Sequence, residues 1–114
     1  QCDMNGKYLH TGDRQDIEFD PAFQGFGHDI TEADGAYSFR TIKPVTYPGR
    51  APHIHVKVFN GEQEVLTSQF YIAGHSANEQ DRIFNRLSDA EAMAVSMTFI
   101  AGADGEETTV NIVI

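Results

Sequence analysis

Residues 47–59 have the sequence Tyr47-Pro48-Gly49-Arg50-Ala51-Pro52-His53-Ile54-His55-Val56-Lys57-Val58-Phe59, and their pattern decides the fold. From His53 onward, polar and apolar side chains alternate, and Ile54, Val56 and Val58 fall on one face. A period of two predicts a strand with one buried face. His53 and His55 therefore share the other face, about 6–7 Å apart along the strand. Both imidazoles could reach one metal ion there, and histidine is the commonest protein ligand for metals.

The segment before this strand is a stiff turn. Pro48 and Pro52 fix their φ angles, and Gly49 can adopt a positive φ. Such a turn would hold Tyr47 and Arg50 near the histidine face. A His-x-His pair by itself is more often the polar face of a half-exposed sheet than a metal site. The rigid loop is therefore the feature that favours a site.

Length and composition restrict the class of protein. A chain of 114 residues with 40% hydrophobic residues suits one globular domain. Eight basic and seventeen acidic residues give a net charge of −9, which argues against nucleic acid or an anionic membrane as partner. The sequence has no apolar run of membrane-spanning length and no leader. Its single cysteine excludes an internal disulfide, and its start at Gln1 suggests a processed chain or a fragment.

Four Asn-Gly or Asp-Gly pairs divide the chain and predict turns, because type I′ hairpin turns need positive φ angles. They are Asn5-Gly6, Asp34-Gly35, Asn60-Gly61 and Asp104-Gly105. Strand-like runs cover residues 36–42, 53–59 and 65–72, and residues 94–100 and 108–114 would form a final hairpin. We predict an all-β fold, an antiparallel β-sandwich of the immunoglobulin or prealbumin type. A capping-box pattern at Ser76 and Glu79 predicts one short surface helix over 77–87, with no functional role.

The hairpin after residue 59 sets which side chains join the histidine face. A three-residue loop with a bulge at Gly61 would place Gln69 on the side of His53 and His55. A strict two-residue turn would place Ser68 there instead. We expect the bulged register, because a buried glutamine among apolar neighbours needs a polar partner.

Four side chains are candidate metal donors, namely Tyr8, Tyr47, His53 and His55. Zinc sites favour cysteine, histidine and carboxylate, whereas calcium and magnesium sites favour carboxylate and carbonyl oxygens. A phenol has an ordinary pKa of about 10 and needs a strong Lewis acid to ionise, for which ferric iron is the natural candidate. Fe³⁺, two phenolates and one hydroxide sum to zero charge, which suits an apolar pocket. Spacing alone does not select Tyr8, because it is remote in sequence.

Several motifs follow one another along nearly the whole chain. They are Gly6-Lys7-Tyr8-Leu9-His10, Asp20-Pro21-Ala22-Phe23-Gln24-Gly25-Phe26-Gly27, Gly35-Ala36-Tyr37-Ser38-Phe39-Arg40-Thr41-Ile42-Lys43-Pro44, the stretch from Tyr47 to His55, and Ser68-Gln69-Phe70-Tyr71. Together they resemble the intradiol ring-cleavage dioxygenases. The branch of that family that cleaves protocatechuate, or short stand-alone members, is closer than the catechol-cleaving branch, whose helical dimerisation domain has no counterpart here.

The resemblance implies a non-haem Fe(III) centre held by Tyr8, Tyr47, His53 and His55. In the family the tyrosine of the Tyr-Pro loop leaves the iron when a catechol dianion chelates it, so Tyr47 would be the labile ligand. The iron then makes the catecholate reactive toward O₂, and the ring opens between its two hydroxyl-bearing carbons. By the same match, Arg50 would stabilise negative charge on the substrate. Gln69 would be a polar pocket residue that does not touch the iron.

From these observations we expect residues 1–114 to form a single intradiol dioxygenase core domain without the N-terminal strands of the family domain. We expect intradiol cleavage of a catechol-type ring by O₂ to a muconate-type dicarboxylic acid, with either a homo- or a hetero-oligomeric assembly open. One alternative is a β-sandwich binding module of the same family that has lost turnover. A zinc hydrolase using His53 and His55 is less favoured, because no carboxylate ligand or base is well placed.

Overall fold

The computed structural model describes residues 1–7 and 22–114 of the chain. These fall into two compact units, Gln1–Val45 and Thr46–Ile114. The described secondary structure is mostly strand with little helix, which confirms the all-β class. Its sheets have three and two strands and are open, so they do not by themselves make the expected sandwich. No helix in the described ranges is long and apolar enough to cross a membrane.

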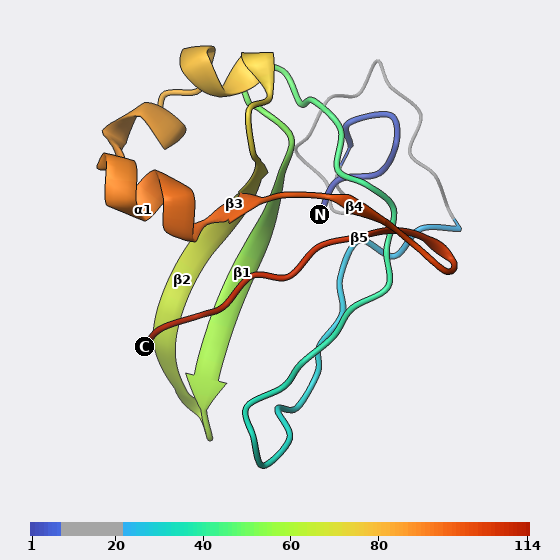
Figure 1. The fold of residues 1–114 in the computed structure, drawn as a ribbon, viewed down its shortest axis with the longest axis vertical. Helices are drawn as coiled ribbons and strands as arrows, with labels where there is room; N and C mark the ends of the chain where they lie inside the picture. Colours follow the sequence, from blue (N-terminus) through green and yellow to red (C-terminus); the bar gives the residue numbers. More distant parts are fainter. Residues whose placement is uncertain (8–21) are drawn as a thin grey trace. The chain divides into compact units, whose positions relative to one another are not determined.

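The larger sheet contains the predicted histidine strand (Figure 1). It consists of β1 (His53–Asn60), β2 (Gln63–Ile72) and β3 (Ser96–Met97), in the order β1-β2-β3. β1 and β2 are antiparallel, whereas β3 runs parallel to β2, which differs from the antiparallel arrangement expected. The predicted alternation in β1 is confirmed, because its apolar side chains are half-buried and those from His55 onward on the other face are exposed.

The register of the β1–β2 hairpin brings Gln69 opposite His55 and Tyr71 opposite His53. The prediction that Gln69 shares the histidine face is therefore confirmed. The loop differs from the expected three-residue loop with a bulge at Gly61, because Asn60 pairs with Gln63 across a two-residue connection. The irregularity comes next to this turn, at the step between Val58 and Phe59, where Val65 of β2 has no residue opposite it, and it shifts the register by one residue. That shift restores the parity which a two-residue turn alone would have reversed.

The single helix expected over 77–87 is wrong. The segment forms two 3₁₀ helices, η1 (Ser76–Gln80) and η2 (Phe84–Arg86), and the α-helix α1 (Asp89–Ala94) follows them. His75, not Ser76, caps η1, and Ser88 with Glu91 forms the capping box of α1. Asp81 separates the two 3₁₀ helices because its carboxylate accepts the backbone N–H groups of residues 83 and 84. A side chain that bonds nearby backbone in this way competes with a continuous helix.

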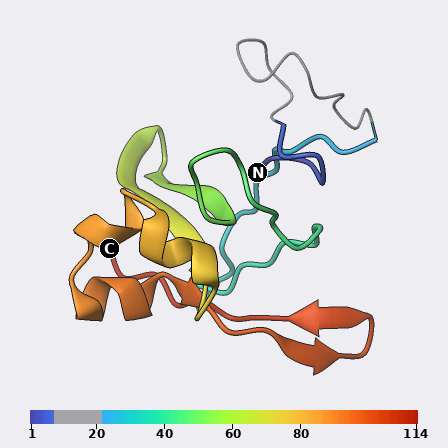
Figure 2. The same cartoon turned by 90° about the horizontal axis from the view of Figure 1, so that it is seen from above.

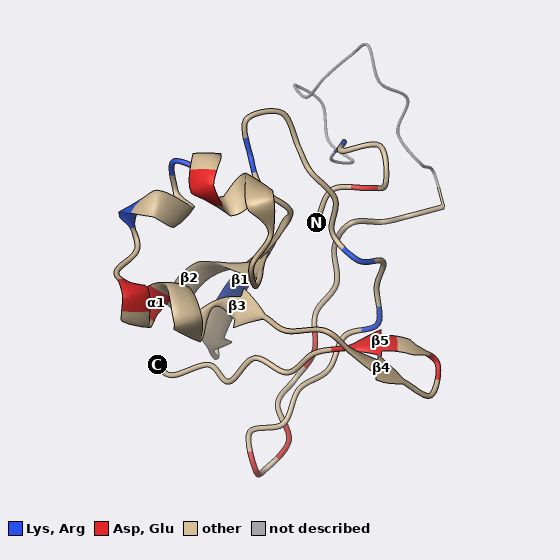
Figure 3. Cartoon of the chain, turned by 45° about the horizontal axis from the view of Figure 1, so that its top comes forward, with Lys and Arg blue, Asp and Glu red and all other residues tan. Residues whose placement is uncertain are grey.

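The predicted final hairpin exists, but with shorter arms. β4 (Ile100–Gly102) pairs with β5 (Gly105–Glu107), so the expected arms at 94–100 and 108–114 are wrong (Figure 2). Acidic residues lie on β5 and on α1 (Figure 3). Residues 36–42, expected as a strand, have no strand assignment. The four glycines of the predicted turn pairs all have positive φ, at Gly6, Gly35, Gly61 and Gly105.

Candidate functional site

The two imidazoles at the start of β1 converge. His53 Nε2 lies 3.2 Å from His55 Nε2. On the far side of its ring, His53 Nδ1 lies 2.7 Å from the carbonyl oxygen of Ala51. A carbonyl can only accept, so Nδ1 carries the proton and Nε2 presents a lone pair. Fixing the tautomer of a histidine through its other nitrogen is the usual way in which proteins prepare a metal-binding imidazole.

Both imidazoles are held in the neutral form. Burial lowers the pKa of His53, whose side chain is fully buried, and the positive charge of Arg50 adds to this effect against the opposing influence of Ala51 and Asp81. His55 as a whole residue is exposed, but the protein around its ring removes enough water, with His53 and the positive charge of Arg50 beside it, to lower its pKa to about 4. Neutral imidazole is the form that binds metals. The pair is therefore competent to bind a metal ion at neutral pH.

The loop before β1 is a tight turn, as the sequence predicts. Arg50 N–H donates to the Tyr47 carbonyl at 2.7 Å, and Tyr47 N–H donates to the Arg50 carbonyl at 3.2 Å. Gly49 has φ 77° and follows Pro48, which is the pattern of a type II turn. The backbones of Tyr47 and Arg50 are thus paired, and both residues lie within a few positions of His53 along the chain.

The Arg50 guanidinium is the centre of a polar network beside the histidines. Its Nη1 lies 3.5 Å from His53 Nε2, and its Nη2 donates to Gln69 Oε1 and, at 3.2 Å, to the Tyr71 hydroxyl. The Tyr71 hydroxyl in turn donates to Gln69 Oε1 at 2.9 Å. Burial raises the pKa of Tyr71, so this phenol stays protonated as a donor. The Gln69 amide oxygen is therefore occupied twice, which leaves its Nε2 hydrogens as donors.

The buried carboxylate of Asp81 also belongs to this network and binds Arg50. Asp81 has no exposed surface, and its Oδ2 accepts from Arg50 Nε at 2.9 Å and from Ala51 N–H at 2.8 Å. Its Oδ1 accepts from Ile83 N–H and Phe84 N–H, each at 3.0 Å. Burial alone would raise the pKa of Asp81, but these backbone N–H groups and the guanidinium outweigh it and lower the pKa.

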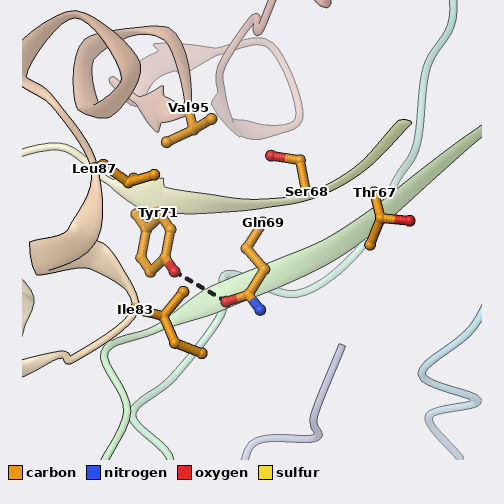
Figure 4. Close-up of a pocket in the computed structure, with 7 residues that line it drawn as sticks. All are labelled: Thr67, Ser68, Gln69, Tyr71, Ile83, Leu87 and Val95. Carbon is orange, nitrogen blue, oxygen red and sulfur yellow. Dashed lines mark hydrogen bonds between the residues drawn. The ribbon is translucent and has the colours of Figure 1, made fainter. Parts of the chain in front are cut away.

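A groove of about 220 Å³ opens next to this network (Figure 4). Tyr71 and Gln69 point toward one another from β2, and Ile83 and Leu87 contribute apolar surface from the 3₁₀ region. The volume is below the roughly 300–1,000 Å³ of pockets for drug-sized ligands, so a molecule with a single ring is the appropriate size class. Its lining residues are Thr67, Ser68, Gln69, Tyr71, Ile83, Leu87 and Val95.

The structure brings together four of the predicted site residues, namely Arg50, His53, His55 and Gln69. It adds Tyr71 and Asp81, which the sequence does not predict as site residues. Tyr8, the remote candidate ligand, lies outside the described residues. Tyr71 could have been found from the hairpin register, because it is two residues from Gln69 on the same face. No spacing pattern points to Asp81, which lies 31 positions from Arg50.

The histidine geometry fits a shared metal ion. Two imidazole nitrogens bound at about 2.1 Å would stand roughly 3.0–3.4 Å apart at bond angles near 90–110°, and the observed separation is 3.2 Å. In the described ranges, no group of three or more His, Cys, Asp or Glu side chains is placed to hold a metal.

Comparison with known proteins gives consistent results. The whole chain, residues 1–114, matches the model of a dioxygenase family. Over 100 residues it is 37% identical to the protocatechuate 3,4-dioxygenase beta chain of Burkholderia cepacia, a match that covers 79% of this chain and 42% of that protein. The solved dioxygenase domain of a dioxygenase carbohydrate-binding protein fusion from Streptomyces sp. SirexAA-E is similar, with a TM-score of 0.75 and 36% identity. That match covers 100% of this chain and 63% of the solved one. The chain thus spans less than half the length of the curated relative.

Proposed function

The chain belongs to the intradiol ring-cleavage dioxygenase family, and from this premise we propose that it cleaves a catechol-type ring with O₂ to give a muconate-type dicarboxylic acid. One observation carries the proposal. Two neutral imidazoles present their Nε2 atoms 3.2 Å apart, with a confined guanidinium 3.5 Å from one of them. The same guanidinium donates to Gln69 and Tyr71, which line the groove. These contacts support a metal site beside a fixed positive charge.

We propose Fe(III) as the cofactor, with Tyr8, Tyr47, His53 and His55 as its protein ligands. The tautomer of His53 and the 3.2 Å separation of the two Nε2 atoms support this set, because nitrogens at that spacing can bind one metal ion. The short Pro48–Gly49 turn supports the role of Tyr47, because it pairs the Tyr47 backbone with that of Arg50. The iron, when bound, would withdraw electron density from a chelated catecholate and so make it reactive toward O₂.

The protein side chains supply binding and charge stabilisation. The catechol needs one face of the ring against apolar surface, and Ile83 and Leu87 provide such surface in the groove. Negative charge that develops on the substrate is met by the Arg50 guanidinium, which cannot lose its proton. Gln69 Nε2 offers a further donor, since its oxygen is held by Arg50 and Tyr71. Donors fixed before the reaction stabilise a charged transition state without reorganising.

The larger assembly is also a proposal. The half-buried apolar face of β1, formed by Ile54, Val56 and Val58, needs a covering layer, and we propose that the β1–β2–β3 sheet is one layer of the family β-sandwich. The Burkholderia relative is named as a beta chain, which favours assembly with a second kind of chain. A catechol substrate that carries a carboxylate, as protocatechuate does, is compatible with the cationic Arg50.

Visible absorption and oxygen uptake test the proposed function together. The iron-loaded protein should absorb visible light, because ferric phenolate is coloured, and it should consume O₂ with catechol or protocatechuate. His55→Ala should lose both the colour and the oxygen uptake. Lys57→Ala is the matched control, because Lys57 lies on the same face of β1 and is exposed.

The outcomes separate the competing functions. A coloured protein that consumes no oxygen with either substrate would support the binding module that has lost turnover. A colourless protein that holds zinc would support the hydrolase. The second outcome is disfavoured because the described part of the chain shows no third His, Cys, Asp or Glu with the histidine pair.

A further inference from the structure

We propose that Asp81 is a positioning residue, which acts through Arg50 to fix the guanidinium between the histidine pair and the groove. Asp81 belongs to none of the motifs that define the candidate site, and it lies in a segment for which the sequence predicts no functional role. The inference rests on the proposed function only for its effect on turnover. Its structural half concerns the free chain and is testable without iron.

The first observation is the way in which one carboxylate oxygen is shared. Asp81 Oδ2 accepts from Arg50 Nε at 2.9 Å and from Ala51 N–H at 2.8 Å. Ala51 is the residue whose carbonyl fixes the His53 tautomer. One oxygen atom is therefore bonded both to the charged side chain of the site and to the N–H of the residue whose carbonyl orients the first histidine.

The second observation is the geometry of the guanidinium. This group is planar and its five N–H bonds have fixed directions, so a partner on Nε sets where both Nη atoms point. With Nε held by Asp81, Nη1 faces His53 and Nη2 faces Gln69 and Tyr71. The Arg50 side chain is only 18% exposed and Asp81 is fully buried, so water competes little for this bond.

The third observation is that the carboxylate is itself immobile. Its other oxygen accepts two backbone N–H groups at the start of η2, from Ile83 and Phe84. Ile83 also lines the groove. Backbone bonds therefore hold Asp81 in place, so that the Arg50 guanidinium it binds is also fixed, which is the property expected of a positioning residue.

The first experiment measures Arg50 directly by NMR in the free chain. Its Nε–H should exchange with solvent at least about tenfold more slowly than those of Arg82 and Arg86, because a buried ion pair protects it. Both comparison residues are exposed. In Asp81→Asn this protection should be lost, whereas Glu79→Gln, the same charge change at an exposed side chain two residues away, should keep it. Equal exchange of all three arginines in the unsubstituted chain would overturn the proposal, even if the variant fails to fold.

The second experiment is a double-mutant cycle on the iron-loaded protein. Asp81→Asn should reduce kcat by about tenfold or more with a smaller change in KM, because an interaction made in the transition state is weakened. In an Arg50→Ala background the same substitution should change kcat by less than about twofold. Equal losses in the two backgrounds would show that Asp81 acts only as a structural residue, and would overturn the positioning role.

Failure of the proposed function gives a different result. A chain without ring-cleaving activity would leave kcat unmeasurable, while the exchange experiment would still confirm or reject the Asp81–Arg50 linkage.

Discussion

At the scale of the residue, the Arg50 side chain has a partner at each of its three nitrogens. It is bonded by Asp81 at Nε and faces His53, Gln69 and Tyr71 through its two terminal nitrogens. A flexible arginine would lose rotamer entropy each time it met a charged substrate. Here that ordering is already present in the free protein, so the guanidinium can stabilise developing charge without rearrangement.

Arg50→Ala should leave iron bound while slowing the reaction. Arg50 is not among the proposed ligands, so the metal content and the visible spectrum of the loaded protein should be retained. The kcat should fall by about 10²–10³-fold, the loss typical of removing one charge-stabilising donor. Metal analysis and single-turnover kinetics measure the two effects. Loss of the metal along with the rate would instead give Arg50 a structural role.

Asp81 should make the stability of the protein depend on acidity. The folded state lowers the pKa of this carboxyl below its ordinary value of 3.8, so its stabilising effect is complete above that pH. The effect is lost as the pH falls through the lower, folded value. The free energy of unfolding of Asp81→Asn should thus be about 1–3 kcal/mol lower than that of the unsubstituted chain at pH 7.

The difference in unfolding free energy between Asp81→Asn and the unsubstituted chain should become smaller when unfolding by urea is repeated near pH 3. Glu79→Gln, an exposed neighbour, should show little difference at either pH. If the unfolding free energies of Asp81→Asn and the unsubstituted chain differed by the same amount at pH 7 and pH 3, the lowered pKa of Asp81 would be contradicted.

At the scale of the element, the β1–β2 hairpin could be predicted well from the sequence. Alternation from His53 onward requires a strand, and the Asn60-Gly61 pair requires a turn. The parity that brings Gln69 to the histidine face was also predictable, because a buried amide needs polar partners. The position of the irregularity was not, since bulges on either side of the turn give the same parity.

The segment from 76 to 94 could not be predicted to the same degree. Ile83, Phe84 and Leu87 have a spacing that suits either a continuous helix or two short turns. Bonds from the Asp81 carboxylate to nearby backbone decide between them, and its bond to Arg50 spans 31 residues. Such a contact has no local signature. The role of Tyr8 as a ligand also stays a prediction, because it lies outside the described residues.

The turn before β1 and the turn after it offer a matched pair of substitutions. Gly49 has φ 77° and Gly61 has φ 63°, and an added Cβ would meet no atom within 4 Å at either position. Alanine should therefore cost a similar amount at both, about 1 kcal/mol of unfolding free energy, through the backbone alone.

Only Gly49→Ala should also reduce turnover, because its turn carries Tyr47 and Arg50. Thermal unfolding and oxygen uptake on the two variants provide the measurements. Equal activity in the two alanine variants would mean that the Pro48–Gly49 turn does not control the site.

At the scale of the whole molecule, metal binding and folding should be coupled. His53 and His55 are adjacent only when β1 is formed and the Ala51 carbonyl orients the first ring. An unfolded chain lacks this arrangement, so iron should bind the folded state preferentially. Binding then stabilises that state by about 2.7 kcal/mol when free iron is one hundredfold above its dissociation constant.

The midpoint of thermal unfolding should accordingly rise by several degrees when ferric iron is supplied from a chelate that keeps free iron about one hundredfold above its dissociation constant. His55→Ala should show no such rise, because one imidazole cannot replace the pair. Lys57→Ala should respond as the unsubstituted chain does, and so should Arg50→Ala, whose side chain is assigned to charge stabilisation. A rise of equal size in His55→Ala would place the bound iron elsewhere on the molecule. A rise that disappeared in Arg50→Ala would instead mean that the guanidinium supports the metal centre itself.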